Sequence, residues 1–87
     1  MKVITGAQIR MARGFLKWSA KQLAEEAGLG VATVIRMEEY DGLPNAKGAN
    51  IEAVYDVLQK ALKERGAVLT YNDGHGPGVC LKKPVSE

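Results

Sequence analysis

The side chains most able to do chemistry in this chain are its basic ones, and they are unevenly distributed. Residues 1–24 carry Lys2, Arg10, Arg13, Lys17 and Lys21 and no acid, whereas all ten Asp and Glu residues follow them. A basic segment of this kind could meet phosphate groups, and an ordinary solvated face is the alternative. The formal net charge is only +2, so the distribution of charge, and not its total, raises a nucleic-acid partner.

Groups that could catalyse a reaction or hold a metal are sparse. His75 is the only histidine and Cys80 the only cysteine, so a Ser–His–Asp set and a Cys–His pair at metal-ligand spacing are both unsupported. The glycines at positions 74, 76 and 78 do not make a phosphate loop, because no helix follows them. We therefore expect no enzyme, no metal and no cofactor.

Length and composition set the remaining limits. The 87 residues suffice for one domain with a thin core, and 46% apolar with 25% charged residues is ordinary for a globular protein. A single cysteine forms no internal disulfide, and we find neither a signal peptide nor an apolar run long enough for a membrane span. These features predict a cytoplasmic protein.

Two capping boxes predict where the first helices begin. Thr5 with Gln8 and Ser19 with Gln22 each place a hydroxyl before a helix and a glutamine three residues later. They predict helices over about residues 6–16 and 20–27, and Gly28 ends the second of them.

Apolar spacing predicts two further helices. Val34 and Met37 form the inner side of a third, from about Val31 to Glu39 or Tyr40. The apolar stripe between Ile51 and Leu62 indicates a fourth helix over residues 51–65, capped by Asn50 and stopped by Gly66.

The end of the chain predicts a β-hairpin. Residues 67–71 and 79–82 are typical of strands, and the intervening segment is dense in turn-forming residues. An isolated hairpin is marginal in water, so this one needs a helix or a second chain to pack on. The predicted fold is therefore mainly α, with four helices and a C-terminal hairpin.

The second and third predicted helices have the features of a helix-turn-helix. Ala24 is small enough for a close helix crossing, Gly28 provides the turn, and Val34 and Met37 anchor the third helix from inside. The outer face of the third helix is then free to enter a major groove.

The segment WSAKQLAEEAGLGVATVIRMEE resembles the helix-turn-helix of phage-repressor-like regulators, the Cro/C1 or XRE group. The pattern Ser-x-x-x-Leu-Ala-x-x-x-Gly, followed by Thr-Val-x-x-Met-Glu, carries a resemblance that covers about residues 6–65. The stretch GAVLTYNDGHGPGVCLKK also resembles the tail of a short bacterial subgroup with terminal β structure. The resemblance implies a DNA-binding domain over residues 1–66, a hairpin extension for packing or dimerisation over residues 67–87, and a small homodimeric transcriptional regulator.

The resemblance also implies roles for single residues. The groove-facing positions are Gly30, Val31, Ala32, Ile35 and Arg36, and the positions near phosphate are Ser19, Ala20 and Thr33. A structural ion pair is implied between Arg13 and Glu38. Arg36 is the best base reader, because its fork can bond two acceptors of a guanine. Lys17, Lys21 and Lys47 are further candidates for phosphate contacts.

Four positions depart from the pattern of the group. Ala20, Gly30, Glu39 and Tyr40 stand where a glutamine, a polar cap, a basic residue and a glycine are usual. The predicted reading face is therefore unusually apolar. This keeps a second function open, in which the same fold binds a protein partner, as in an antitoxin that binds its toxin.

Overall fold

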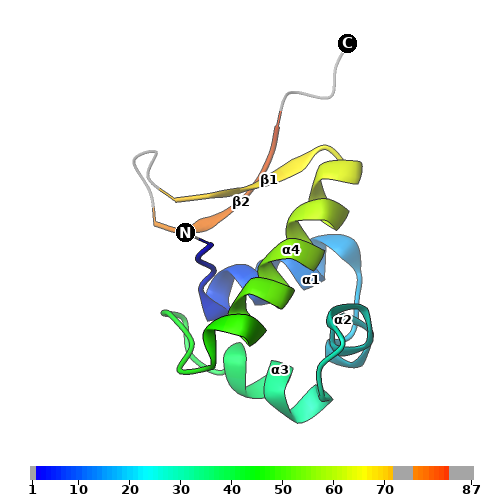
Figure 1. Ribbon diagram of the computed structural model, residues 1–87. Helices are drawn as coiled ribbons and strands as arrows, with labels where there is room; N and C mark the ends of the chain where they lie inside the picture. The colour runs from blue at the N-terminus through cyan, green and yellow to red at the C-terminus, as the bar shows by residue number, and fades with distance from the viewer. Residues whose placement is uncertain (1, 72–75, 83–87) are drawn as a thin grey trace.

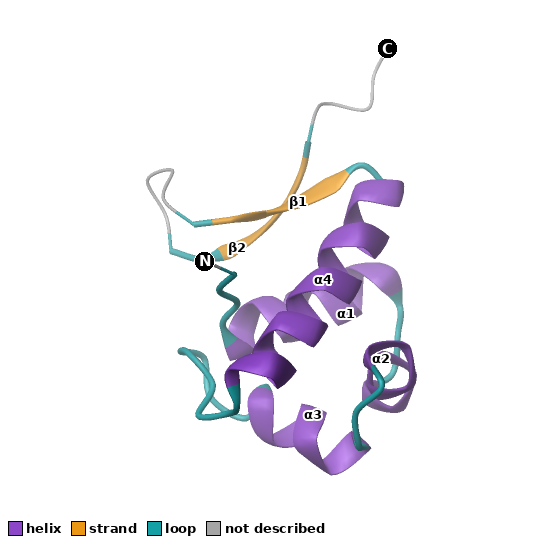
Figure 2. Cartoon of the chain, in the orientation of Figure 1, coloured by secondary structure: helices purple, strands orange, loops and turns teal. Residues whose placement is uncertain are grey.

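The computed structural model describes residues 2–71 and 76–82, over which the chain forms four helices and a two-stranded hairpin (Figure 1). Their bounds are α1 Gly6–Leu16, α2 Ala20–Ala27, α3 Val31–Met37, α4 Gly48–Glu64, β1 Ala67–Thr70 and β2 Gly78–Leu81. The mainly helical fold with a C-terminal hairpin is as predicted (Figure 2). Most of the predicted turn, including His75, lies outside the described residues.

Local capping explains why α1 and α2 match their predicted bounds. At α1 the capping box is complete: the Gln8 N–H donates to Thr5 Oγ1 at 3.1 Å, and the Thr5 N–H donates to Gln8 Oε1 at 2.9 Å. At α2 only half of the predicted box forms, since the Gln22 N–H donates to Ser19 Oγ without a return bond. Gly28 ends α2 with φ of 72°, a conformation that glycine adopts without strain.

The predicted end of α3 and start of α4 were wrong. The last residue of α3 is Met37, because Glu38 turns toward α1 and the following carbonyls bond to α1 instead of continuing the helix. The start of α4 is Gly48, with Lys47 and not Asn50 as its N-cap residue. Ala46 already packs against the core, so the backbone is held in place close to Gly48, and the helix begins before Asn50.

The loop between α3 and α4 is bonded to the first turn of α1. Gly6 N–H donates to Gly42 O at 2.8 Å, and Ala7 N–H donates to Asp41 O at 3.3 Å. These bonds satisfy two of the N–H groups that a helix start leaves unpaired. A Cβ at Gly6 would lie 1.9 Å from Tyr40 O, so the approach needs glycine.

One apolar core joins the helices and the hairpin. Ile4, Ile9, Leu23 and Leu58 are among its fully buried members. The inner face of the hairpin contributes Ala67, Leu69 and Val79. The strands are antiparallel, with Ala67 opposite Leu81 and Thr70 opposite Gly78, and the hairpin covers α1 and α4 at the end of the molecule remote from α3 (Figure 1).

Gln8 fastens the hairpin to α1. Its side chain is fully buried, and its Nε2 donates to Thr70 O at 2.9 Å and to Gly78 O at 3.3 Å. The glutamine of the α1 capping box therefore also holds the turn end of the β-ladder, where Thr70 pairs with Gly78.

Candidate nucleic-acid interface

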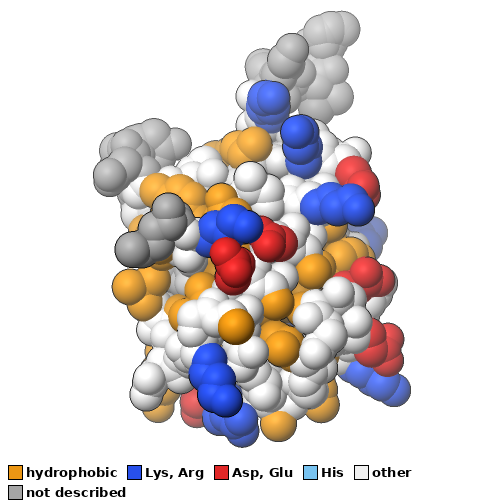
Figure 3. All heavy atoms as spheres, in the orientation of Figure 1, with side chains coloured by type: hydrophobic (Ala, Val, Ile, Leu, Met, Phe, Trp, Pro, Cys, Tyr) orange, Lys and Arg blue, Asp and Glu red, His pale blue; other side chains and the backbone are white. Residues whose placement is uncertain are grey.

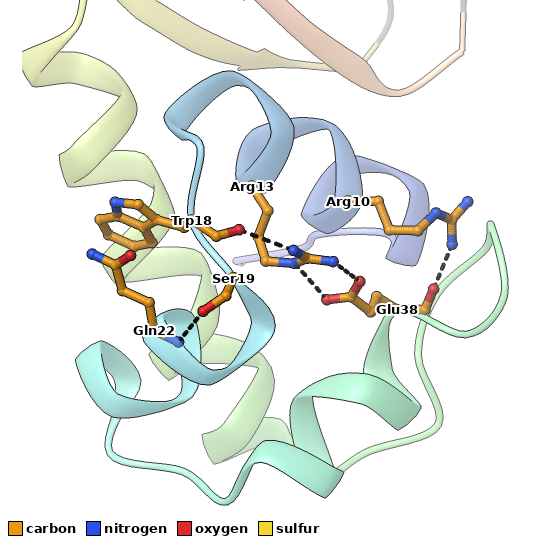
Figure 4. Close-up of polar contacts among 6 residues, drawn as sticks. All are labelled: Arg10, Arg13, Trp18, Ser19, Gln22 and Glu38. Carbon is orange, nitrogen blue, oxygen red and sulfur yellow. Dashed lines mark hydrogen bonds and ion pairs between the residues drawn. The ribbon is translucent and has the colours of Figure 1, made fainter.

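Arg13 and Glu38 form a two-bond ion pair between α1 and the end of α3 (Figure 4). Arg13 Nε lies 2.9 Å from Glu38 Oε2 and Nη2 lies 2.6 Å from Oε1, while Nη1 donates to Trp18 O at 2.9 Å. Hydrogen bonding to Glu38 raises the pKa of Arg13. The Glu38 side chain is 8% exposed and that of Arg13 24%, so the pair fixes α3 from inside and does not face a ligand.

Internal ion pairs occupy two other cations of the basic N-terminal segment. Arg10 bonds to Glu38 O and to the Asp41 carboxylate, and Lys2 Nζ lies 2.7 Å from Asp56. With Arg13, three of the five early cations therefore serve the fold. The five basic residues of segment 1–24 therefore overstate the number of cations that an outside partner could contact.

The basic residues predicted to contact DNA have no such partners. Within residues 2–71 and 76–82, no acidic group lies within ion-pair distance of these exposed side chains, which are Lys17, Lys21, Arg36 and Lys47. Lys17 is the C-cap residue of α1, Lys21 lies in the first turn of α2, Arg36 lies in α3, and Lys47 is the N-cap residue of α4. An exposed cation that makes no ion pair within the chain can pair with an external anion without breaking an existing contact.

The outer face of α3 is exposed and largely apolar. Val31 is 42% exposed and Ile35 53% exposed, and Gly30, Ala32 and Arg36 also lie on the surface. Figure 3 shows Lys and Arg side chains next to hydrophobic ones at this end of the molecule. All five predicted groove-facing residues are thus accessible.

The residues predicted to lie near phosphate differ in accessibility. Ser19 is exposed and caps α2, whereas Ala20 and Thr33 are half-buried. Ala20 packs against the core, so its side chain serves the helix crossing more than any surface contact.

A cleft of about 620 Å³ lies between α3 and the start of α4. Its polar lining brings together Arg36, Lys47 and Thr33 with two residues that sequence analysis missed, Asn45 and Asn50. No side chain caps α4, so the N–H groups of its first turn add partial positive charge on this side. Two cations, amides and a helix start favour an anion here.

Nothing local in the sequence indicated that Asn45 and Asn50 join this cleft. Their position follows from the path of the loop between α3 and α4, which depends on its bonds to Gly6 and Ala7 far away in the chain. Lys17, Lys21 and Ser19 do not line the cleft.

The same loop exposes two large apolar side chains. Tyr40 is 74% exposed and Leu43 68% exposed, and both line a smaller cleft of about 270 Å³ next to Arg36. Glu39 also lines this cleft, so its charge lies close to that of Arg36. The apolar surface of α3 thus continues into the loop.

Among the described residues, no group of three or more His, Cys, Asp or Glu side chains could hold a metal ion. None of the described helices combines the length and apolar character needed to cross a bilayer. Comparisons with protein-family models, with curated proteins and with solved structures found no match.

Proposed function

We propose that this protein binds double-stranded DNA as a small transcriptional regulator, with α3 in the major groove. The observation that carries the proposal is the division of its cations. Lys2, Arg10 and Arg13 are paired within the chain, whereas Lys17, Lys21, Arg36 and Lys47 around α2, α3 and the start of α4 are exposed and unpaired among the described residues, as are Lys60, Lys63 and Lys82 on α4 and the hairpin. Such cations are suited to replace the counterions of a phosphate backbone.

The dimensions of α3 support this function. An α-helix with its side chains is about 10–12 Å in diameter, which fits a major groove about 12 Å wide. Val31 and Ile35 can contact only apolar base groups, such as thymine methyls, so hydrogen-bonded base reading depends mainly on Arg36. We infer that the protein reads few bases directly and gains most of its affinity from phosphates.

Arg36 has two possible roles in this interface. It shares the 620 Å³ cleft with Lys47, which supports a phosphate contact, and its guanidinium fork can also bond one guanine. Loss of a phosphate contact weakens binding to all sequences alike and reduces the salt slope by about one. Loss of a base contact relaxes preference at one position.

The test is a salt titration of DNA binding by fluorescence anisotropy, on a fragment selected from a random pool. We expect affinity to fall steeply with salt, and Lys47→Ala to lower the slope by about one. Lys82→Ala is the matched control, because Lys82 is exposed on the hairpin at the other end of the molecule. Binding without salt dependence, or equal effects of both variants, would refute the proposal.

The exposed apolar residues favour a second candidate, a protein-binding module such as an antitoxin. Val31, Ile35, Tyr40 and Leu43 provide apolar surface of the kind that protein interfaces use. Leu43→Lys separates the two functions, since Leu43 is exposed in the loop outside the predicted reading face, so an added cation there spares DNA binding but disrupts an apolar protein contact. DNA binding unchanged by Arg36→Ala and by Lys17→Ala would favour this second function.

A further inference from the structure

A groove of about 540 Å³ lies between α4 and β1, next to the turn that joins them (Figure 1). Its α4 side is lined by Tyr55, Gln59 and Lys63, which follow one another at intervals of four residues and therefore share one face of the helix. Small-molecule sites have volumes of about 300–1,000 Å³. The groove lies at the end of the molecule remote from α3, so the proposed DNA surface does not account for it (Figure 1).

The strand side of the groove is apolar and aromatic. Val68 and Leu69 line it, and so does Tyr71, whose hydroxyl donates to Val3 O. Because this hydroxyl is already bonded, Tyr71 offers a ligand mainly its ring. Tyr55 provides a second ring from α4, and two rings can hold a flat apolar body by stacked or edge-to-face contact.

Two cations lie at the end of the groove where α4 turns into β1. Lys63 stands before the turn, and Lys82 is held beside it because its N–H donates to Gly66 O at 2.7 Å. Over residues 2–71 and 76–82, neither lysine forms an ion pair and no acidic residue lines the groove. This end of the groove therefore favours a negative group.

The end of α4 offers little opposition to such a group. A helix C-terminus carries partial negative charge on its unpaired carbonyls. Here Leu62 O accepts from the Arg65 N–H at 2.9 Å, and Lys63 O accepts from the Gly66 N–H at 3.1 Å. With these carbonyls bonded within the chain, the two lysines dominate the charge at this end.

We propose that the groove binds a small aromatic carboxylate, with its acid group beside Lys63 and Lys82 and its ring against Tyr55 and Tyr71. Each part of the ligand matches one part of the lining. The exposed Gln59 lies one helical turn from both Tyr55 and Lys63, so its amide can donate a further hydrogen bond to the acid. This site goes beyond the proposed DNA binding and does not depend on it.

The test is a titration of the full chain, without DNA, followed by the ¹H–¹⁵N shifts of its backbone amides. The probe is 1-naphthylacetate, and 1-naphthylacetamide is its uncharged match. A ligand of about 14 non-hydrogen atoms is expected to bind with a Kd of about 1 mM or tighter. The shifts should saturate and lie in the second half of α4, in β1 and at Lys82, and the amide should bind about three- to tenfold more weakly.

Lysine variants test the acid end of the groove. Lys63→Gln should weaken the carboxylate about threefold and leave the amide unchanged, because it removes one of two exposed charges. Lys60→Gln is the matched control, since Lys60 is exposed on α4 but does not line the groove. It should change the Kd of neither compound.

A filling variant tests the body of the groove. Gln59 is exposed, so Gln59→Trp places a large side chain in the groove without disturbing the core. It should abolish binding of both compounds. Lys60→Trp is the control for added bulk on α4 and should bind both as the parent does, and circular dichroism checks that each variant is folded.

Four results would overturn the site. They are the absence of saturable shifts up to about 10 mM, tenfold above the expected Kd, shifts centred on α3, equal binding of the two compounds, and equal effects of the variants at positions 63 and 60. Shifts of the groove residues that follow protein concentration alone would show that a second copy occupies it, and would overturn the site too. A chain that binds the carboxylate but no DNA refutes only the proposed function.

Discussion

At the residue scale, two contacts hold the end of α3 against α1. One is the close approach of the loop backbone to Gly6, and the other is the ion pair of Arg13 with Glu38. Neither residue of the pair belongs to the exposed face of α3. Both contacts determine how that face is held relative to the rest of the molecule.

Gly6→Ala should destabilise the protein by about 1–3 kcal/mol, because the new methyl group collides with the carbonyl of Tyr40 and the loop must move. Gly14→Ala is the control within the same helix. A Cβ at Gly14 meets nothing within 4 Å, so alanine should stabilise α1 by about 0.5–1 kcal/mol. Urea unfolding measures both, and equal effects would show that the approach at Gly6 is not close.

Removal of Arg13 should cost more stability than removal of Glu38. Arg13→Met leaves a buried carboxylate without its partner, whereas Glu38→Met leaves a partly hydrated guanidinium still bonded to Trp18 O. We expect about 3 kcal/mol for the first and about 1–2 kcal/mol for the second, nearer to the value of exposed pairs. Thermal or urea unfolding decides, and the reverse order would contradict this account.

At the element scale, local signals predicted α1 and α2, and long-range contacts decided the rest. The caps of α1 and α2 lie within four residues of the helices that they start or stop, so a short window of sequence contains them. The end of α3 depends on Arg13, 25 residues away from Glu38. The outward position of Val31 and Ile35 was expected only from the resemblance to repressor-like regulators, and nothing in the sequence indicated Asn45 in the cleft.

Gln8 has two roles, a capping bond within α1 and a contact with the hairpin far away in the sequence. The sequence predicts only its capping bond, yet its amide also holds β1 and β2. Gln8→Leu should therefore cost about 1–3 kcal/mol, since it removes a fully buried amide that donates to Thr70 O and Gly78 O and accepts from the Thr5 N–H. Hydrogen exchange should show that the hairpin amides lose protection before those of α4.

Gln22→Leu provides the control for this prediction. Gln22 occupies the same third position of α2, but it is exposed and its side chain makes no recorded bond to the cap. We expect a change within about 0.5 kcal/mol. A comparable loss at both positions would mean that capping, and not the hairpin contact, carries the effect of Gln8.

At the scale of the whole molecule, Tyr71 connects the hairpin to the N-terminal arm through a hydrogen bond from its hydroxyl to Val3 O. Burial, with a smaller contribution from Tyr55, raises the pKa of Tyr71. The folded state therefore holds this proton more tightly than the unfolded state. Its contribution to stability is complete below about pH 10 and is lost as pH rises through the higher folded-state pKa.

Tyr71→Phe should be less stable than the parent at pH 8 by about 0.5–1.5 kcal/mol, and the difference should shrink above pH 10. Urea unfolding at a series of pH values measures this difference, and absorbance at 295 nm follows the ionisation itself. Tyr40→Phe is the control for loss of a tyrosine hydroxyl, because Tyr40 is largely exposed and the change should alter stability by less than about 0.5 kcal/mol at pH 8. A constant difference for Tyr71→Phe would refute the linkage.

The bonds of Gln8 also have a consequence for synthesis of the chain. Gln8 is separated from Thr70 by 62 positions in the sequence and from Gly78 by 70. The start of α1 therefore leaves the ribosome long before the two carbonyl groups that Gln8 binds. Helices can form during translation from contacts near in sequence, but the hairpin requires closure of almost the whole chain. We expect the nascent protein to retain an open face over α1 and α4 until β2 is released.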